Sequence, residues 1–425
     1  MNGNKGISKL MAVSIAVIVA VAAICSGYYL WISSHPTAPP TKDKILIGIE
    51  NPSTGTYADL GRYLLRGYVL WRDFVNAKGG IYVAEYGKRL PVEFVIYDDG
   101  SDPSKAVELV ERLILVDKVD YIFGGYGSPI VLSATTVAEK YGVPYINTQG
   151  FALSIFQRNY TWIFSTCPTS PMFAETALKI MSHIPENQRP KTAAFLYEDS
   201  AVCIDHVTFM KKFIEEWKLP LTIVFEERYK PKTTDFTATL LKVKSSGAEA
   251  FFAISYTSEC MIITRQMKEV GYYPVYFQTA MGASVPEYIK ELGPDADGAT
   301  TTYIAGPALN PEYAVGMKEL WDFFTKIYKP EEWHYCIATG FSGGQFFEAI
   351  INKTGTLDYE AFRKAAHEIT VTTCLGPVKV APDGSNEKAV YACAQVQNGT
   401  YVVVWPPEAM MPGTKFIWPA KKPPS

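Results

Sequence analysis

The apolar residues of the chain follow two alternating spacings, and this alternation predicts the secondary structure. Short runs rich in β-branched residues, such as Ile45–Glu50 and Ala250–Ile254, are typical of buried strands. Between such runs lie longer segments with apolar residues at every third or fourth position, as in amphipathic helices. The apolar face of the segment Leu60–Ala77 shows this spacing: Leu64, Tyr68, Trp71 and Val75. The chain therefore alternates strands with helices.

These strand–helix units recur in two series. We expect further strands at Val92–Asp98, Tyr121–Gly124, Pro144–Ile146, Thr192–Tyr197, Leu221–Glu227, Val275–Thr279 and Thr400–Trp405. We expect further helices at Pro103–Val116, Pro129–Tyr141, Cys203–Trp217, Phe236–Ser245, Glu259–Val270, Glu312–Ile327, Thr339–Ile351 and Tyr359–Ile369. Repeated units of this kind are typical of parallel sheets covered by helices on both faces. A break near Phe164–Pro168 separates the series, so the pattern predicts an α/β fold with two Rossmann-like lobes.

The N-terminal region, residues 1–42, contains a long uncharged stretch, Leu10–Ile32. At about 1.5 Å per residue, a helix of this length crosses the roughly 30 Å hydrocarbon core of a bilayer. Lys5 and Lys9 precede the stretch and the next charge is Lys42, which places the N-terminus inside and the body outside. We therefore expect a retained transmembrane helix followed by a proline-rich tether. A cleaved signal peptide is the alternative.

The composition fits a globular protein outside the cytoplasm. Of 425 residues, 48% are hydrophobic and 20% are charged, which excludes disorder. A formal net charge of −3 and the absence of a basic run argue against nucleic acid as a partner. Five histidines and no CxxC pair leave little material for a metal site, so we expect no metal and no cofactor. Sequons at Asn159, Asn352 and Asn398 predict glycosylation and agree weakly with an extracytoplasmic location.

The cysteines suggest disulfide bonding. Beyond Cys25 the chain holds six cysteines, an even number that suits an oxidising compartment. A predicted strand enters an Asp383-Gly384 turn, and folding about that turn sets Cys374 opposite Cys393. We therefore expect a Cys374–Cys393 disulfide. Free buried thiols are the alternative.

The loop after the third predicted strand, Gly124–Pro129, has the features of a ligand site. In open α/β sheets, ligands bind beyond the carboxyl ends of the strands. This loop leads straight into a helix, whose N-terminus offers free N–H groups and a positive dipole end that suit a carboxylate. Gly127 permits close backbone approach, and Ser128 adds a hydroxyl donor. Ser128 could also be only a helix cap, and the two roles can coexist.

Motifs distributed along the body define a family resemblance. They are Asn76-Ala77-Lys78-Gly79-Gly80-Ile81, Asp98-Asp99-Gly100-Ser101-Asp102-Pro103, Gly124-Gly125-Tyr126-Gly127-Ser128, Tyr141-Gly142-Val143-Pro144-Tyr145-Ile146, Arg265-Gln266-Met267-Lys268-Glu269-Val270-Gly271 and Gly376-Pro377-Val378. With them, residues 43–406 resemble type I periplasmic binding proteins, in the branch of the leucine/isoleucine/valine-binding proteins of ABC importers.

The resemblance implies an architecture and a role. Lobe one would comprise residues 43–166 and 303–388, and lobe two residues 167–302 and 389–418. Three chain crossings would form the hinge: Thr166, Thr302 and Ala389. The protein would be a membrane-tethered extracellular monomer that captures a small organic ligand between the lobes and delivers it to the permease of an ABC importer. A sensory or scaffold ectodomain of the same fold is the alternative.

The resemblance also implies binding residues. Ser128 and the segment Gln149-Gly150-Phe151 match positions that hold the ligand's carboxylate and amine, and Tyr256 matches a tyrosine of the second lobe. The acid that pairs with an amino acid's ammonium would fall near Thr279-Ala280, where this chain has no carboxylate. The aromatic residues that could line the cleft are Tyr57, Tyr126, Phe151, Tyr197 and Tyr256.

The missing acid affects the expected ligand. The family favours branched-chain or hydrophobic amino acids, but an enclosed ammonium without a counter-charge is costly. We therefore expect a related carboxylate or amide with an apolar or aromatic body, unless Glu198, Asp199 or Glu259 supplies the charge.

One motif resembles that of an enzyme. Gly340-Phe341-Ser342-Gly343-Gly344 matches the G-x-S-x-G elbow of α/β hydrolases, which requires a strand before the serine and a helix after it. Here the serine falls inside a single helical pattern, and only His367 follows as a potential base. The glycines more plausibly allow close helix packing. We therefore expect no enzyme, with a Ser342 hydrolase as the remote alternative.

Overall fold

The computed structural model describes residues 17, 20–24, 26 and 41–420 of the chain. Two compact units are present, Met1–Lys42 and Asp43–Ser425, and the fold described below is that of the second. Most of the stretch predicted to cross the membrane, and most of its tether, lie outside the described residues. Among the described residues, no helix has the length and apolar character needed to span a bilayer.

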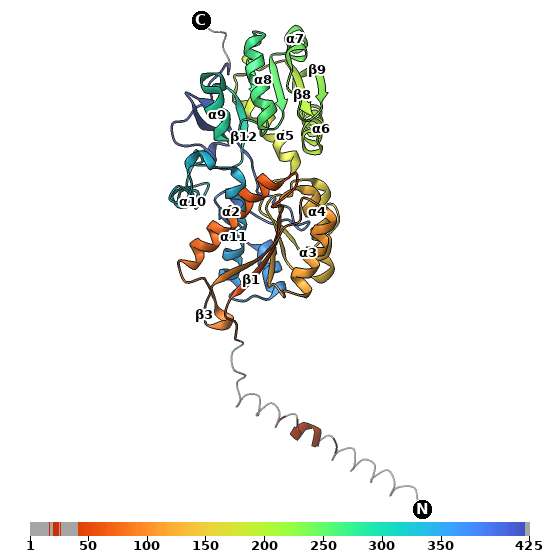
Figure 1. Ribbon diagram of the computed structural model, residues 1–425, viewed down its shortest axis with the longest axis vertical. Coiled ribbons are helices and arrows are strands. Elements are labelled where there is room, and N and C mark those ends of the chain that lie inside the picture. Colours follow the sequence, from red (N-terminus) through yellow and green to blue (C-terminus); the bar gives the residue numbers. More distant parts are fainter. Residues whose placement is uncertain (1–16, 18–19, 25, 27–40, 421–425) are drawn as a thin grey trace, which may run out of the picture. The chain divides into compact units, whose positions relative to one another are not determined.

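A wholly parallel sheet forms the centre of the first lobe, with the strand order β4-β1-β5-β6-β7. Its strands are β1 (Ile45–Glu50), β4 (Val92–Tyr97), β5 (Tyr121–Phe123), β6 (Tyr145–Asn147) and β7 (Ile163–Ser165). The helices that cover it are α2 (Ala58–Asn76) and α11 (Tyr335–Thr354) on one face, and α3 (Pro103–Leu115) and α4 (Ser128–Tyr141) on the other (Figure 1).

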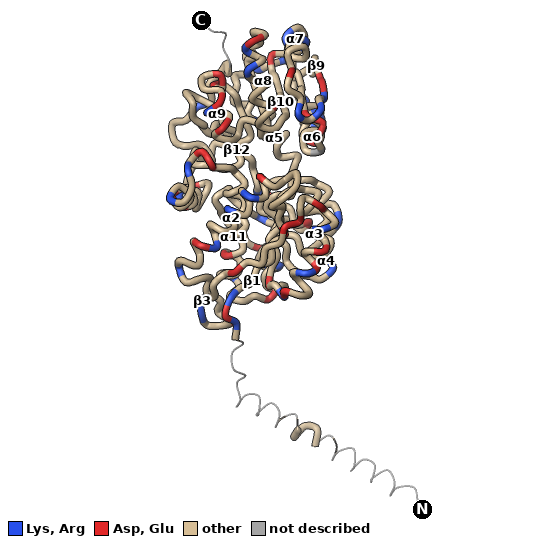
Figure 2. Tube along the Cα trace, viewed as in Figure 1, with Lys and Arg blue, Asp and Glu red and all other residues tan. Residues whose placement is uncertain are grey.

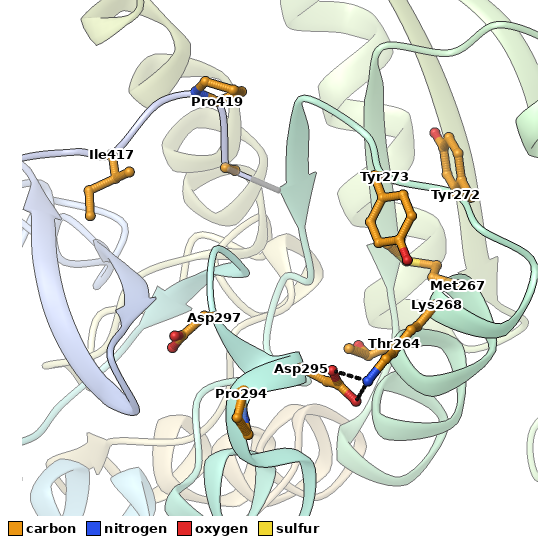
Figure 3. A pocket seen from close by; sticks show the side chains of 11 residues that line it. Thr264, Met267, Lys268, Tyr272, Tyr273, Pro294, Asp295, Asp297, Ile417 and Pro419 are labelled. Atoms are coloured by element: carbon orange, nitrogen blue, oxygen red, sulfur yellow. Dashed lines mark hydrogen bonds and ion pairs between the residues drawn. The ribbon is translucent and has the colours of Figure 1, made fainter. Parts of the chain in front are cut away.

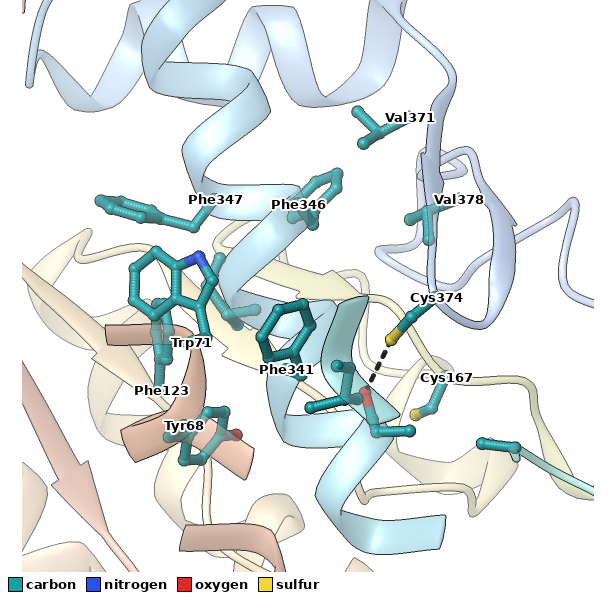
Figure 4. Packing of buried hydrophobic residues seen from close by; sticks show 14 of the residues in the cluster. Tyr68, Trp71, Phe123, Cys167, Phe341, Phe346, Phe347, Val371, Cys374 and Val378 are labelled. Atoms are coloured by element: carbon teal, nitrogen blue, oxygen red, sulfur yellow. Dashed lines mark hydrogen bonds between the residues drawn. The ribbon is translucent and has the colours of Figure 1, made fainter. Parts of the chain in front are cut away.

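Strand β5 shows how the sheet separates two hydrophobic cores. Tyr121 and Phe123 pack with α2 and α11, whereas Ile122 packs with α3 and α4. Figure 4 shows the first of these cores, where Trp71 of α2 lies beside Phe123 and Phe347. Alternation along a strand thus buries both faces, as expected for a parallel sheet.

The second lobe contains a larger sheet in the order β16-β15-β12-β11-β10-β8-β9. Its strands are β8 (Thr192–Glu198), β9 (Thr222–Tyr229), β10 (Ala250–Ile254), β11 (Tyr276–Gln278), β12 (Thr300–Tyr303), β15 (Ala392–Gln397) and β16 (Thr400–Trp405). Its helices are α5 (Ser170–Lys179) and α6 (Ala201–Glu216) on one face, and α7 (Thr237–Ser245), α8 (Thr257–Glu269) and α9 (Pro286–Leu292) on the other. Strands β15 and β16 are antiparallel to their neighbours, so this sheet is mixed rather than parallel throughout.

The chain passes between the two sheets more than once. It leaves the first sheet after β7, returns after β12, and enters the second sheet again at β15. The elements outside the two main sheets are β2 (Ile81–Val83), β3 (Lys88–Leu90), α10 (Met317–Phe324), α12 (Tyr359–Glu368), β13 (Val371–Thr373) and β14 (Gly376–Val378). Acidic and basic residues are interspersed over both lobes without a basic cluster (Figure 2).

The predicted Cys374–Cys393 disulfide is wrong. All six cysteines of the described residues are free and buried. The turn at Asp383-Gly384 forms, but only the bridge Val380–Asn386 continues it, and the strands then separate. Cys374 follows β13, where its thiol donates to the carbonyl of Ala338 in α11 (Figure 4). Cys393 lies in β15 of the second sheet, so the two thiols belong to different cores.

Candidate functional site

The carboxyl ends of the strands in both sheets carry most of the residues that the sequence singled out. Tyr126 and Ser128 follow β5, Gln149 follows β6, and Tyr256 follows β10. These edges are where open α/β sheets bind ligands.

Ser128 is the first residue of α4 and uses its hydroxyl oxygen as an acceptor. Its Oγ accepts hydrogen bonds from the backbone N–H groups of Phe151 and Ala152, each at 3.1 Å. A hydroxyl has two acceptor positions and one donor, so the proton of Ser128 is left to donate elsewhere. Gly127 has a φ of 108°, in the region that favours glycine, and turns the chain into the helix. Ser128 is therefore not the cap of α4, because the N-cap residue is Gly127 and no side chain caps this helix.

The loop after β6 is fixed by Asn147. The Asn147 Oδ1 atom accepts from the N–H of Gly150 at 2.7 Å, and its Nδ2 donates to the Gly150 carbonyl at 2.9 Å. Gln149 is almost fully buried and donates through Nε2 to Thr339 of α11, while its Oε1 has no partner among the described residues. Phe151 is buried with its ring edge-on to Phe173 of α5 at 5.8 Å. This aromatic ring packs between the lobes instead of standing free.

Four tyrosines gather at the site. The rings of Tyr57 and Tyr126 lie 5.9 Å apart, and Tyr126 shares a hydrogen bond with Tyr335 at the start of α11. Burial raises the pKa of Tyr126 well above its ordinary value, so its hydroxyl stays protonated. Tyr256 of the second lobe is 37% exposed. Its hydroxyl is close enough to the hydroxyls of Tyr57, Tyr126 and Tyr335 for their charges to interact. The predicted aromatic residues of the two lobes are therefore neighbours, whereas Tyr197 bonds Glu226 on the edge strand β9.

Sequence reasoning missed Tyr335. The helix containing it was expected to start at Thr339, but α11 begins one turn earlier because the Nδ1 atom of His334 accepts from Cys336 N–H. A histidine is a rare N-cap, so the sequence held only a weak signal for this start.

Thr279 and Ala280 offer no polar group to a ligand. Both are fully buried, and Thr279 donates through N–H and Oγ1 to the carbonyl of Thr300. The Ala280 carbonyl accepts from Thr302 N–H at 2.7 Å. These hydrogen bonds join the two residues that follow β11 to strand β12.

The three acids named as substitutes differ in their surroundings. Asp199 is 46% exposed at its side chain and pairs with Arg228 at 3.4 Å. Glu198 and Glu259 are only 5% and 6% exposed, and neither makes an ion pair with lysine or arginine within the described residues. Burial, followed by the nearby Glu259, raises the pKa of Glu198. Two buried carboxylates therefore stand beside Tyr256.

A further carboxyl group, Glu50, supports the first-lobe loop from below. It is fully buried at the end of β1, where its Oε1 accepts from Tyr145 Oη at 2.5 Å and from Gly125 N–H at 3.2 Å. Burial raises the pKa of Glu50 to about 8. Tyr68 donates to the carbonyl of Gly124 at 2.7 Å. The loop that leads to Ser128 is thus held from two sides.

One cavity of about 460 Å³ lies elsewhere in the second lobe, at the C-terminal half of α8. In Figure 3, Lys268 reaches Asp295 across it, with Nζ–O distances of 2.8 and 3.0 Å. Helix α8 starts beside the carboxyl end of β10, so its far end belongs to the opposite edge of the sheet. This cavity is therefore separate from the candidate site.

The hydrolase alternative for Ser342 is wrong. Ser342 lies in the middle of α11, fully buried, and its hydroxyl donates to Thr373 Oγ1 at 2.9 Å. No strand precedes it, as a nucleophile elbow requires. The glycines serve packing, because a Cβ atom at Gly344 would collide with Trp71 and one at Gly67 of α2 with the Ile337 carbonyl.

Two α/β lobes with polar and aromatic groups at their strand ends are an arrangement that suits the binding of a small ligand. Residues 44–400 match the family described as periplasmic binding protein. The chain belongs to this family, within its leucine/isoleucine/valine-binding branch. Because the family consists of binding proteins, the expectation that the chain is not an enzyme is confirmed.

Individual relatives agree with this assignment. The Leu/Ile/Val-binding protein homolog 7 of Brucella suis is 26% identical over 92% of this chain and 96% of its own length. The structure of LivJ from Streptococcus pneumoniae, in complex with isoleucine, matches with a TM-score of 0.69 at 20% identity, over 86% of this chain and 100% of LivJ. A solute-binding protein of Rhodopseudomonas palustris in complex with benzoate matches with a TM-score of 0.67 at 20% identity, over 85% of this chain and 95% of its own. These structures share the two-lobed fold with this chain.

Proposed function

We propose that the protein is the extracytoplasmic solute-binding component of an ABC importer and that it binds a small organic molecule carrying a carboxylate. The observation that carries this proposal is the geometry of Ser128, whose hydroxyl proton remains available at the start of α4. A free donor beside a helix N-terminus suits an anionic oxygen.

The relatives support a carboxylate on an apolar body. LivJ was solved with isoleucine, and the Rhodopseudomonas palustris protein with benzoate. Tyr57, Tyr126, Tyr256 and Tyr335 provide the aromatic surface that such a body would contact. The carboxylate would lie toward Ser128 and Gly127, whereas the backbone N–H of Gly150 is already bound by Asn147.

The lobes would move about the predicted crossings. We extend the proposal to lobes of residues 43–166 with 303–388, and 167–302 with 389–418. The passages of the chain between the two sheets support these limits. Ligand contacts to both lobes would stabilise a closed state, which the permease would recognise.

The N-terminal segment would tether the protein to the membrane. The uncharged stretch 10–32 with its flanking lysines supports an anchor whose body faces outside. Protease treatment of intact cells should then release a soluble body cut in the tether; native protein free in the medium with an N-terminus near Pro36 would contradict this. The exposed positions of Asn159, Asn352 and Asn398 are compatible with glycosylation.

Titration calorimetry with isoleucine, leucine, valine, benzoate and 4-hydroxybenzoate tests the binding role. We expect at least one saturable one-to-one isotherm, matched by a ligand that mass spectrometry finds in the purified protein. Transport into vesicles with the cognate permease would separate import from sensing. Failure of every carboxylate to bind, with a copurified ligand that has no acidic group, would contradict the proposal.

A further inference from the structure

The three predicted chain crossings between the lobes meet at one small cavity. Its volume is about 10 Å³, and it is lined by Thr166 and Pro168 of the first crossing, Ile304 after the second, and residues 389–391 of the third. A cavity of this size has room for about one water molecule. The crossings are also joined directly, because Asn386 donates through Nδ2 to the Thr166 carbonyl at 3.2 Å. The hinge is therefore closely packed, and its polar side chains depend on a few neighbours for hydrogen bonds.

Each crossing carries a buried hydroxyl that has no hydrogen-bond partner among the described residues. These hydroxyls belong to Thr166, Thr302 and Tyr391, each of which is at most 1% exposed. The backbone of the two threonines is bonded, since their N–H groups donate to the carbonyls of Asn147 and Ala280 at 3.0 and 2.7 Å. A buried polar group without a hydrogen bond is costly, and such groups are uncommon in folded proteins. Their recurrence at all three crossings calls for a physical reason.

Two of these hydroxyls lie on the face of the second sheet that α5 covers. The ring of Tyr391 stacks on Phe173 of α5 at 3.8 Å, and the Tyr391 carbonyl accepts from Thr176 Oγ1 at 3.1 Å. Thr302 is in register with Cys393, which packs in the core that includes α5. Side chains in register on neighbouring strands project to the same face. A movement of α5 would therefore change the surroundings of both hydroxyls.

Helix α5 is also held by the first lobe. Its first residue, Ser170, donates through N–H and Oγ to the carbonyl of Phe151 at 2.8 and 2.9 Å. The hydroxyl of Tyr391 is close enough to the Cys167 thiol and the Tyr126 hydroxyl for their charges to interact, yet it bonds neither. Tyr126 belongs to the first lobe, so the angle between the lobes sets the distance between these two hydroxyls.

The arrangement of the lobes described here leaves the candidate site open to solvent. Tyr256 is 37% exposed, and Tyr57 is partly exposed. Small-ligand sites in proteins typically cover most of the surface of the ligand. A ligand enclosed at this site therefore requires a second arrangement, in which the lobes lie closer together.

We infer that the hydroxyls of Thr166, Thr302 and Tyr391 bias the hinge against the open arrangement, because closure gives them the partners that they lack here. This inference rests on the proposed function, since a ligand must select the closed arrangement. Tyr126 and Cys167 offer such partners to Tyr391. Free energy that the unpaired hydroxyls cost in the open arrangement is recovered on closure, so ligand contacts have to supply less of it.

Thermal unfolding of the ligand-free protein tests the cost of the hydroxyls. Tyr391→Phe and Thr302→Val keep the shape of the side chains and break no hydrogen bond, so the midpoint should stay unchanged or rise. The matched controls are Tyr276→Phe and Thr300→Val, in the same sheet. These two residues are also fully buried, but their hydroxyls donate to backbone carbonyls at 3.0 and 2.6 Å. Each control should lower the midpoint by about 2 °C.

Titration calorimetry with isoleucine and benzoate tests the bias. For the compound that binds wild type, Tyr391→Phe should raise the Kd roughly five- to a hundredfold, because the open arrangement no longer carries the cost of the hydroxyl. Thr302→Val should act in the same direction. Tyr276→Phe should keep the wild-type Kd, since its hydrogen bond lies within the second lobe and is made in both arrangements.

The outcomes separate this inference from the proposed function. A midpoint lowered as much by Tyr391→Phe as by Tyr276→Phe would show that the hydroxyl is already bonded, for example to a water in the hinge cavity, and would overturn the inference. An unchanged or lower Kd in both Tyr391→Phe and Thr302→Val would also overturn it, while the carboxylate-binding role would stand. If Tyr391→Phe does not fold, Thr302→Val against Thr300→Val decides. Failure of wild type to bind any carboxylate would instead contradict the proposed function, and the midpoints would still show whether the hydroxyls are unpaired.

Discussion

The carboxyl edges of the two sheets share one topology but carry opposite chemistry. At the first edge, backbone N–H groups, glycines and the Ser128 hydroxyl surround the start of α4, and the nearest acid, Glu50, lies beneath the loop. At the second edge, Glu198 ends β8 and Glu259 lies in the first turn of α8. Parallel strands followed by helices produce the same frame in both lobes, so the difference comes from the residues at the strand ends.

The comparison shows that one frame can carry hydrogen-bond donors in one lobe and carboxyl groups in the other. The donors of the first edge suit an anionic oxygen, whereas the second edge carries buried carboxyl groups, so the proposed ligand carboxylate would lie at the first edge. The acid at the first edge has a different use, because Glu50 bonds Tyr145 and Gly125 and serves the loop. Glu50 thus supports the loop that presents Ser128.

The largest expected effect concerns Glu50 and the pH dependence of stability. Its pKa is raised from an ordinary 4.5 to about 8 in the folded protein, so the folded state binds more protons between these values. The contribution of Glu50 is fully present below about pH 4.5, falls by roughly 1.4 kcal/mol per pH unit above it, and is lost as the pH rises through about 8. Urea unfolding from pH 5 to pH 8 measures this slope.

The Glu50→Gln variant should lack that part of the slope and gain stability relative to wild type as the pH rises. Glu93→Gln, an exposed acid of β4 paired with Lys44, is the control and should keep the wild-type slope. Parallel curves for wild type and Glu50→Gln would show that the first-edge acid is not held protonated.

The next effect tests the donor at the first edge. Ser128→Ala removes a charge-assisted hydrogen bond and should weaken ligand binding by about 1.5–3 kcal/mol, roughly ten- to a hundredfold. Titration calorimetry with the carboxylate that binds wild type measures it. Ser154→Ala, an exposed serine three residues beyond Phe151, should have no effect. Unchanged affinity in Ser128→Ala would remove the anion-binding role from this edge.

A smaller effect is expected where the lobes meet. Tyr335→Phe keeps the ring but removes the hydrogen bond shared with Tyr126, which should weaken binding by about 0.5–1.5 kcal/mol. Tyr63→Phe retains the ring that stacks on His334 at 4.8 Å and serves as the control. An effect equal in both variants would indicate a general loss of stability, which thermal unfolding without ligand would reveal.

The smallest effect is expected from reductant. Because all six cysteines of the described residues are free, dithiothreitol should not change the midpoint of thermal unfolding. Thiol titration of the denatured, unreduced body should count all six. A count of four or fewer thiols would indicate that the protein contains a disulfide.

Much of the fold followed from local patterns. Strands β1, β10 and β16 were predicted within one residue, because each is a short buried or half-buried run rich in branched or aromatic residues. The short strands β12, β13 and β14 and helix α9 were missed, since their few residues carry too little periodicity. The disulfide prediction was wrong for a related reason. A turn motif predicts only the residues next to the turn, whereas Cys393 lies in β15, which pairs with the distant strand β12 in another sheet.

The sequence by itself determined the two-lobed α/β family and the loop that presents Ser128, because spacing of apolar residues and turn glycines act locally. Only the tertiary structure decided which polar groups become neighbours. It buried Glu198 beside Glu259 and left Asp199 in solvent with Arg228, although the sequence offered all three acids equally. It also brought Tyr335 to Tyr126 from a helix that lies more than two hundred residues later. The physical reason is that burial and charge pairing depend on the register of strands and the packing of helices, which residues distant along the chain set together.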